Sequence, residues 1–217
     1  MDELTMMQKI AIWTIPVVLA ITVHEVAHGW VAMKFGDKTS QMLGRLTLNP
    51  FKHIDPIGTI LVPGVLLLLG GFIFGWAKAI PVNPKNFKRP KHDMAWVAVA
   101  GPVSNILMAI GWAVIAKIGY LVLPSYDGIG KFMIYSGMAG IAINLILAIL
   151  NMIPIPPLDG SRIAAAFLPK KLYYYYMRIE PYGFFIILGL MLIGILSVLI
   201  STPYQIAQSL IFKLVGL

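Results

Sequence analysis

The sequence predicts an all-α polytopic membrane protein with about four to six transmembrane segments. Of the 217 residues, 59% are hydrophobic and only 12% are charged, a balance far from that of soluble domains. The hydrophobic residues also form long runs, and a helix needs about 20 of them to cross a bilayer core of roughly 30 Å. Runs of this length lie at residues 10–33, 94–122, 129–152 and 181–202.

The first run, 10–33, contains His24-Glu25-Val26-Ala27-His28, an HExxH motif. On a helix its two imidazoles lie four residues apart on one face, where both can bind zinc, and Glu25 can act as a general base towards water. Ionisable residues near a bilayer centre cost a few kcal/mol each (~2.5–3.5 for Asp, Lys and Arg) and usually mark a functional site. The alternative is a pair of core histidines whose nitrogens bond to backbone carbonyls.

A further apolar run at 57–75 contains Pro63, Gly64, Gly70 and Gly71, and the basic residues decide how to interpret it. Loops at 34–53, 76–93 and 153–180 hold four, five and four of the 17 basic residues. If 57–75 crossed the membrane, the first two loops would face opposite sides, against the positive-inside rule. We therefore predict a re-entrant segment or tight hairpin with both flanks cytoplasmic; a spanning helix is the alternative.

The rest of the chain gives no sign of a second domain. We expect one integral-membrane domain over 1–217, with a catalytic core at about 10–165 and a transmembrane helix and amphipathic tail at 181–217. Segments 44–50 and 78–84 have the alternation or the prolines of extended backbone, so we expect short strand-like loops there.

Two histidines leave zinc without a third protein ligand, and the absence of cysteine restricts that ligand to nitrogen or oxygen. Asp159 is the best candidate, because three prolines in the stretch 151–160 prevent a regular helix and let the carboxylate turn inward. Two histidines and a carboxylate form a known catalytic zinc set. The alternatives are that Asp159 is an ordinary turn residue and that His53 or His92, both interpreted as interfacial, is the ligand.

Three blocks together carry a family resemblance: HEVAHG at 24–29, AGPVSN at 100–105 and NMIPIPPLDG at 151–160. With these blocks the chain resembles a small member of the site-2 protease family of intramembrane zinc metallopeptidases. The stretches GRLTLNPFKHIDPIGTI (44–60) and FGWAKAIPVNP (74–84) are similar to the compact bacterial and archaeal branch, which lacks extra soluble domains.

The resemblance implies roles for individual residues. Glu25 would be the general base, and Asn151 would hold the substrate carbonyl or stabilise the oxyanion. Asn105 would orient the substrate or pack the core. One Zn²⁺ per chain would be held by three ligands: His24, His28 and Asp159.

The resemblance also implies hydrolysis of peptide bonds within or near the transmembrane segments of other proteins. The expected partners are such substrates and the lipid bilayer, in a prokaryotic cell membrane with the active site towards the cytoplasm. The net charge of +8 reflects membrane orientation, so we expect no nucleic-acid partner. A catalytically silent membrane scaffold of the same fold is the main alternative, and a zinc transporter or sensor is another.

Overall fold

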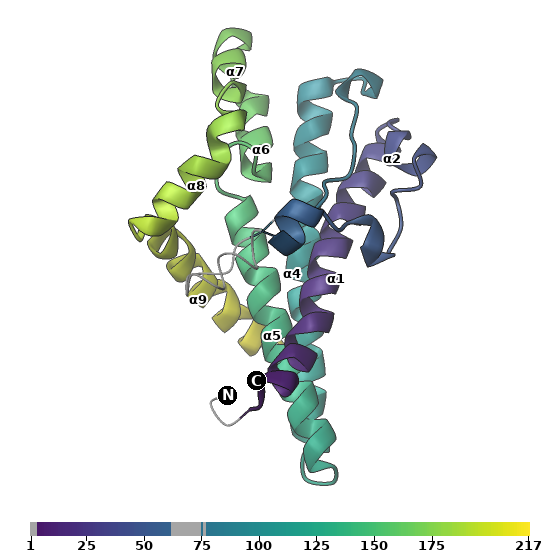
Figure 1. Cartoon of the computed structure of the whole chain (residues 1–217), viewed down its shortest axis with the longest axis vertical. Coiled ribbons are helices and arrows are strands. Elements are labelled where there is room, and N and C mark those ends of the chain that lie inside the picture. The colour runs from purple at the N-terminus through teal and green to yellow at the C-terminus, as the bar shows by residue number, and fades with distance from the viewer. Residues whose placement is uncertain (1–3, 62–74, 76) are drawn as a thin grey trace.

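The computed structural model describes residues 4–61, 75 and 77–217, and within them the regular elements are all helical. Four helices are long and apolar enough to cross a bilayer (Figure 1): α1 (Met6–Lys34), α4 (Pro90–Val122), α5 (Asp127–Asn151) and α9 (Ile195–Val215). The predicted all-α polytopic membrane fold is confirmed. Three of the four predicted spans agree with α1, α4 and α5.

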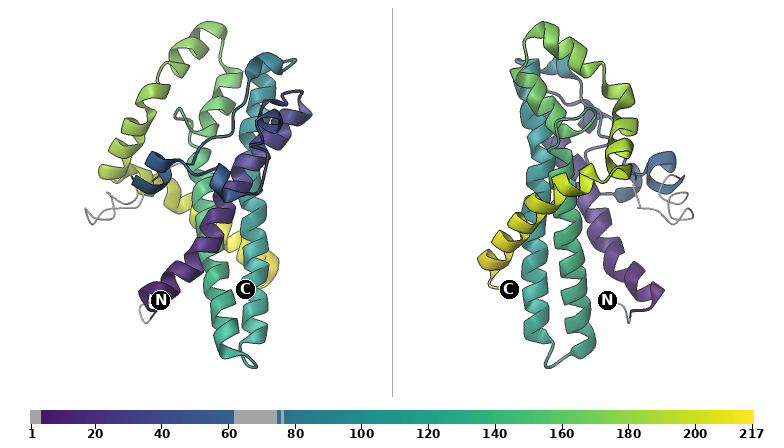
Figure 2. Two further views of the ribbon diagram at one scale, coloured as in Figure 1. Left: turned by 45° about the vertical axis from the view of Figure 1, so that its right-hand side comes forward. Right: turned by 90° about the vertical axis from the view of Figure 1, so that its left-hand side faces the viewer.

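Helices α4 and α5 form a long antiparallel hairpin, and α1 packs across both of them (Figures 1 and 2). Small residues allow the close approach. A Cβ added at Gly137 would lie 2.7 Å from the Cβ of Ala116, and one at Gly140 would enter the ring of Trp112. Glycine and alanine serve this purpose in membrane bundles, where tight van der Waals packing holds helices together.

The basic loops gather at one end of the bundle, opposite the turn that joins α4 to α5 (Figure 1). This end contains α2 (Thr39–Met42), η3 (Pro84–Asn86), α6 (Asp159–Phe167) and α7 (Lys170–Met177). Buried Asp37 ties two of the loops together, accepting hydrogen bonds from the Asn83 backbone N–H and the Asn86 amide, both at 2.7 Å.

The predicted re-entrant segment 57–75 lies largely outside the described residues. Its first residues, 57–61, belong to the π-helical η2 (Pro56–Leu61), and the short helix η1 (Pro50–Lys52) precedes them. On its two flanks, the Lys78 N–H donates to the His53 carbonyl at 2.9 Å. Together with the Asp37 contacts, this bond joins the described parts of loops 34–53 and 76–93, which the charge pattern predicts to lie on the same side of the membrane.

Segments 44–50 and 78–84 are loops, as expected, but neither forms a strand in the described structure. Gly44 has a φ of +63°, which turns the chain at the start of the first segment. Pro81 and Pro84 have no N–H for a ladder in the second. A side chain joins the loops instead: Arg45 Nη2 donates to the Lys78 carbonyl at 2.9 Å.

The C-terminal region also differs from the prediction of a span at 181–202 followed by a surface tail. The turn η4 (Glu180–Tyr182) leads into a short helix, α8 (Gly183–Leu192), and the chain then breaks at Gly194, where φ is +78°. Helix α9 runs through Pro203 to Val215 and packs on α4 and α5. A membrane helix tolerates an internal proline, so the span lies about one helix later than the hydropathy suggested.

Candidate metal centre

Helix α1 brings His24 and His28 to one buried face, as the four-residue spacing requires. The two residues are only 7% and 8% exposed, and the Nε2 atoms of their rings lie 3.0 Å apart. The rings meet edge to face at 88°, so each points a separate nitrogen at the same point in space. A chelating pair is thus formed by α1 alone.

Asp159, the first residue of α6, completes the group. Its Oδ2 lies 3.2 Å from His24 Nε2 and 3.3 Å from His28 Nε2. The preceding turn fits tightly: a Cβ at Gly160 would collide with the carbonyl oxygen of Met152, so a larger residue there would displace the start of α6. Among the described residues, these three form the one cluster suited to a metal ion.

The spacing of the three donor atoms fits zinc. A tetrahedral ion with ligands about 2.0–2.2 Å away holds adjacent donors roughly 3.3–3.6 Å apart, close to the triangle observed here. The Asp159 Oδ2 is buried and receives no hydrogen bond from the described residues. A buried carboxylate oxygen without a partner is costly, and a cation held between it and the two imidazole nitrogens would remove that cost. Three such ligands leave one tetrahedral position open, the arrangement of catalytic zinc sites.

The other nitrogen of each imidazole is held from α4. His28 Nδ1 donates to the Val97 carbonyl at 2.7 Å, and His24 Nδ1 donates to the Asn105 side-chain oxygen at 2.5 Å. With the protons on Nδ1, the Nε2 lone pairs of both rings face the metal position. Such outer hydrogen bonds fix the tautomer and orientation of metal-binding histidines.

Gly101 on α4 leaves the space in which the two rings stand. A Cβ there would lie 2.5 Å from His24 Cε1 and 2.5 Å from both Cε1 and Nε2 of His28. Sequence reasoning did not single out this residue or Val97. The one available signal was the small residue inside the AGPVSN block, in a helix long enough to span the membrane.

Glu25 lies beside the metal group without joining it. Its Oε2 accepts a hydrogen bond from the backbone N–H of Ile80 at 2.8 Å. Ile80 is itself buried and packs over Gly29, where a Cβ would lie 2.5 Å from the Ile80 Cδ1. The segment around Ile80 therefore covers the glutamate and fixes one of its two oxygens.

The two asparagines expected at the site have different surroundings. Asn151 ends α5, is half-buried, and donates back to the Leu147 carbonyl at 3.0 Å. Asn105 is fully buried, and its amide hydrogens are used by the Ala20 carbonyl at 3.2 Å and the Asn144 side chain at 2.8 Å. Asn105 thus lies behind His24, where a substrate has no access to it.

The alternative ligands His53 and His92 are not part of the group. His53 is buried instead of interfacial, and its Nε2 donates to the Thr47 carbonyl at 2.8 Å. His92 is exposed near the start of α4. Both were expected at the membrane interface, but His53 is buried because the loop that contains Thr47 folds over it.

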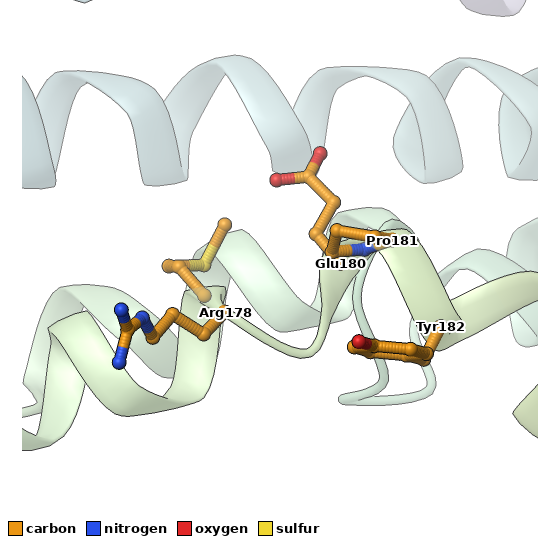
Figure 3. A pocket seen from close by; sticks show the side chains of 5 residues that line it. Arg178, Glu180, Pro181 and Tyr182 are labelled. Carbon is orange, nitrogen blue, oxygen red and sulfur yellow. The ribbon is translucent and has the colours of Figure 1, made fainter.

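A hollow of about 730 Å³ lies away from the metal group, at the turn between α7 and α8 (Figure 3). Its lining residues all come from one short stretch of chain: Met177, Arg178, Glu180, Pro181 and Tyr182. Because no second element contributes polar groups, the hollow is a fold of the surface and offers no reaction centre.

The chain is similar to several proteins named as zinc metalloproteases. It is 38% identical over 208 residues to the Bacillus subtilis protein named "Putative zinc metalloprotease YwhC", a match that covers 92% of this chain and 89% of that protein. It is 30% identical over 143 residues to "Putative zinc metalloprotease Rip2" of Mycolicibacterium smegmatis, covering 65% of this chain and 51% of Rip2. "Zinc metalloprotease MJ0392" of Methanocaldococcus jannaschii is 25% identical over 171 residues, or 77% of this chain and 38% of MJ0392. No family model and no solved structure matches the chain.

Proposed function

This chain belongs to the site-2 protease-like family of zinc metalloproteases, and from that premise we propose that it hydrolyses peptide bonds within or beside transmembrane segments of other proteins. The observation that carries the proposal is the convergence of His24, His28 and Asp159 at a buried point in a bundle of membrane-spanning helices. A hydrolytic zinc centre at that depth suits a substrate that is itself in the bilayer. The relatives' names give the chemistry, and the position of the centre supports the substrate class.

We assign His24, His28 and Asp159 as the ligands of one zinc ion. Zinc bound by such a set supplies Lewis acidity and a water of lowered pKa. The ligands' own task is geometric. The hydrogen bonds that the two imidazoles donate to Asn105 and Val97 hold both rings in their metal-binding orientation before the ion is bound, so the side chains need to move little on binding.

Glu25 is the proposed general base. It follows His24 directly in sequence, and the bond from the Ile80 N–H occupies one carboxylate oxygen. The other oxygen remains to take a proton from the attacking water and deliver it to the leaving amine. This division explains why the motif keeps a glutamate that is not a ligand.

The two asparagines receive separate roles. Asn151 is proposed to stabilise the developing oxyanion, a contact that can contribute ~2.7–4 kcal/mol, with the second hydrogen of its NH2 group, because the first donates to the Leu147 carbonyl. The expected substrate contact of Asn105 is replaced by a positioning role, because its side chain is fully buried and bonded to His24.

We propose that the end with the basic loops faces the cytoplasm of a prokaryotic cell and that the zinc centre lies towards it. The loops joined by Asp37 and the Lys78 N–H are rich in lysine and arginine, which remain on the cytoplasmic side. Substrates would then reach the centre from the inner half of the bilayer.

Cleavage of a labelled transmembrane peptide by purified protein in detergent or vesicles tests the proposal. Glu25→Gln should abolish cleavage and keep zinc, whereas Asp127→Asn, the same change from carboxylate to amide at an exposed site at the opposite end of the bundle, should leave cleavage intact. Wild-type cleavage by Glu25→Gln would refute the protease assignment. The same fold acting as a silent scaffold would then be the better explanation.

A further inference from the structure

Asn144, in the middle of α5, is a fully buried amide in a helix that spans the membrane. It belongs to none of the sequence motifs, and it is not a metal ligand. We propose that Asn144 is a positioning residue that sets the tautomer and orientation of His24 through Asn105. The inference rests on the zinc centre of the proposed function and concerns how that centre is assembled.

The hydrogen bonds define a chain of donors and acceptors with one consistent direction. Asn144 Nδ2 donates to the Gly140 carbonyl at 2.8 Å, and a carbonyl can only accept. The Oδ1 of Asn144 must therefore be the atom that faces Asn105, and it accepts from Asn105 Nδ2 at 2.8 Å. The amide of Asn105 is thereby oriented with its own oxygen towards His24.

The last link reaches the metal position. The Asn105 Oδ1 accepts from His24 Nδ1, so the imidazole proton is held on Nδ1 and the Nε2 lone pair points to the centre. The opposite tautomer would direct an N–H at the metal. The Gly140 carbonyl thus fixes the orientation of both asparagine amides and, through them, the tautomer of the zinc ligand His24.

Asn105 has a second anchor, the Ala20 carbonyl, but at 3.2 Å this bond is longer than the one to Asn144. If the Asn105 amide turned over, its oxygen would face the oxygens of both Ala20 and Asn144. Two oxygen pairs without a proton between them are strongly disfavoured in a buried, apolar setting. Removing Asn144 leaves only one of these two penalties, so the wrong orientation becomes accessible.

A double-mutant cycle on zinc affinity tests the inference, with chelator competition as the measurement and no need for proteolysis. Asn105→Ala and Asn144→Ala should each weaken zinc binding, by ~10–100-fold for loss of an outer-shell partner. Because Asn144 acts through Asn105, the double variant should bind zinc no more weakly than Asn105→Ala alone.

Ser136→Ala is the matched control. Ser136 is a buried polar residue on the same helix whose hydroxyl has no partner among the described residues, and its replacement should leave zinc affinity unchanged. If Asn144→Ala does not fold, Asn144→Ser takes its place. Serine can bond back to the Gly140 carbonyl but is too short to reach Asn105, so Asn144→Ser should lose as much zinc affinity as Asn144→Ala.

Two results would overturn the inference: wild-type zinc affinity in Asn144→Ala, or additive losses in the cycle. An additive result would mean that Asn144 merely supports the fold. The outcome is separable from the proposed function. A coupled cycle in a protein that cleaves no peptide would uphold the inference and reject the protease activity, and an uncoupled cycle in an active protease would do the reverse.

Discussion

Replacing Gly101 by alanine tests the geometry of the metal centre most directly. The added Cβ would lie 2.5 Å from ring atoms of both His24 and His28, whereas ordinary contacts begin at 3.4 Å. The rings would have to retreat by about 0.9 Å, and zinc–ligand distances tolerate only about ±0.2 Å. Overpacking of this kind costs ~1–3 kcal/mol, so zinc affinity should fall roughly 10–100-fold.

The assay is zinc affinity by chelator competition, together with zinc content after purification. Gly111→Ala is the matched control, because Gly111 lies on the same helix and a Cβ there meets nothing within 4 Å. This variant should keep full zinc affinity and gain slightly in helix stability, by ~0.5–1 kcal/mol. Unchanged zinc affinity in Gly101→Ala would refute the arrangement of the two imidazoles against α4.

Three further predictions follow from the same structure. Asp159→Ala should lose most of its zinc by elemental analysis; full retention would show that the third ligand lies elsewhere. Burial favours the neutral form of Asp37, but its hydrogen bonds outweigh that effect and lower the pKa of the carboxyl group. The contribution of the ionised carboxylate to folding stability should therefore be complete above the ordinary pKa of 3.8 and disappear as the pH falls through the lowered pKa. Thermal unfolding against pH should therefore show Asp37→Asn less stable by ~1–3 kcal/mol near neutrality and equal to wild type in strong acid. Single cysteines at Thr39 and Asn86 should both react with an impermeant reagent from the cytoplasmic side, and one at Tyr126 from the other side; opposite labelling of the first two would refute the shared-end topology.

The sequence was sufficient wherever the geometry is local. The HExxH spacing fixes the His24–His28 pair on any helix, and no tertiary contact is needed to bring the two rings together. The charge pattern predicts that loops 34–53 and 76–93 lie on one side of the membrane, because the distribution of lysine and arginine follows from membrane insertion, and the hydrogen bonds that join the two loops agree with it.

The sequence was insufficient where a break or a contact depends on tertiary structure. Hydropathy gives one apolar run across 181–202. It does not predict that the chain breaks at Gly194, where the backbone is left-handed, or that α9 continues through Pro203. Gly101 and Asn144 carry no local signal either, because their importance comes from α4 and α5 lying against α1. Likewise, the alternation at 44–50 could not show that Gly44 turns the chain there, or that the Arg45 side chain joins this loop to the Lys78 carbonyl.

The three candidate zinc ligands are far apart in the order of synthesis. His24 and His28 belong to α1, and Asp159 follows His28 by 131 residues. At translation rates of about 5–20 residues per second, roughly 7–26 s separate them. A nascent chain therefore presents its HExxH helix well before all three candidate ligands exist, and a complete zinc set has to wait until α4, α5 and the start of α6 have been made.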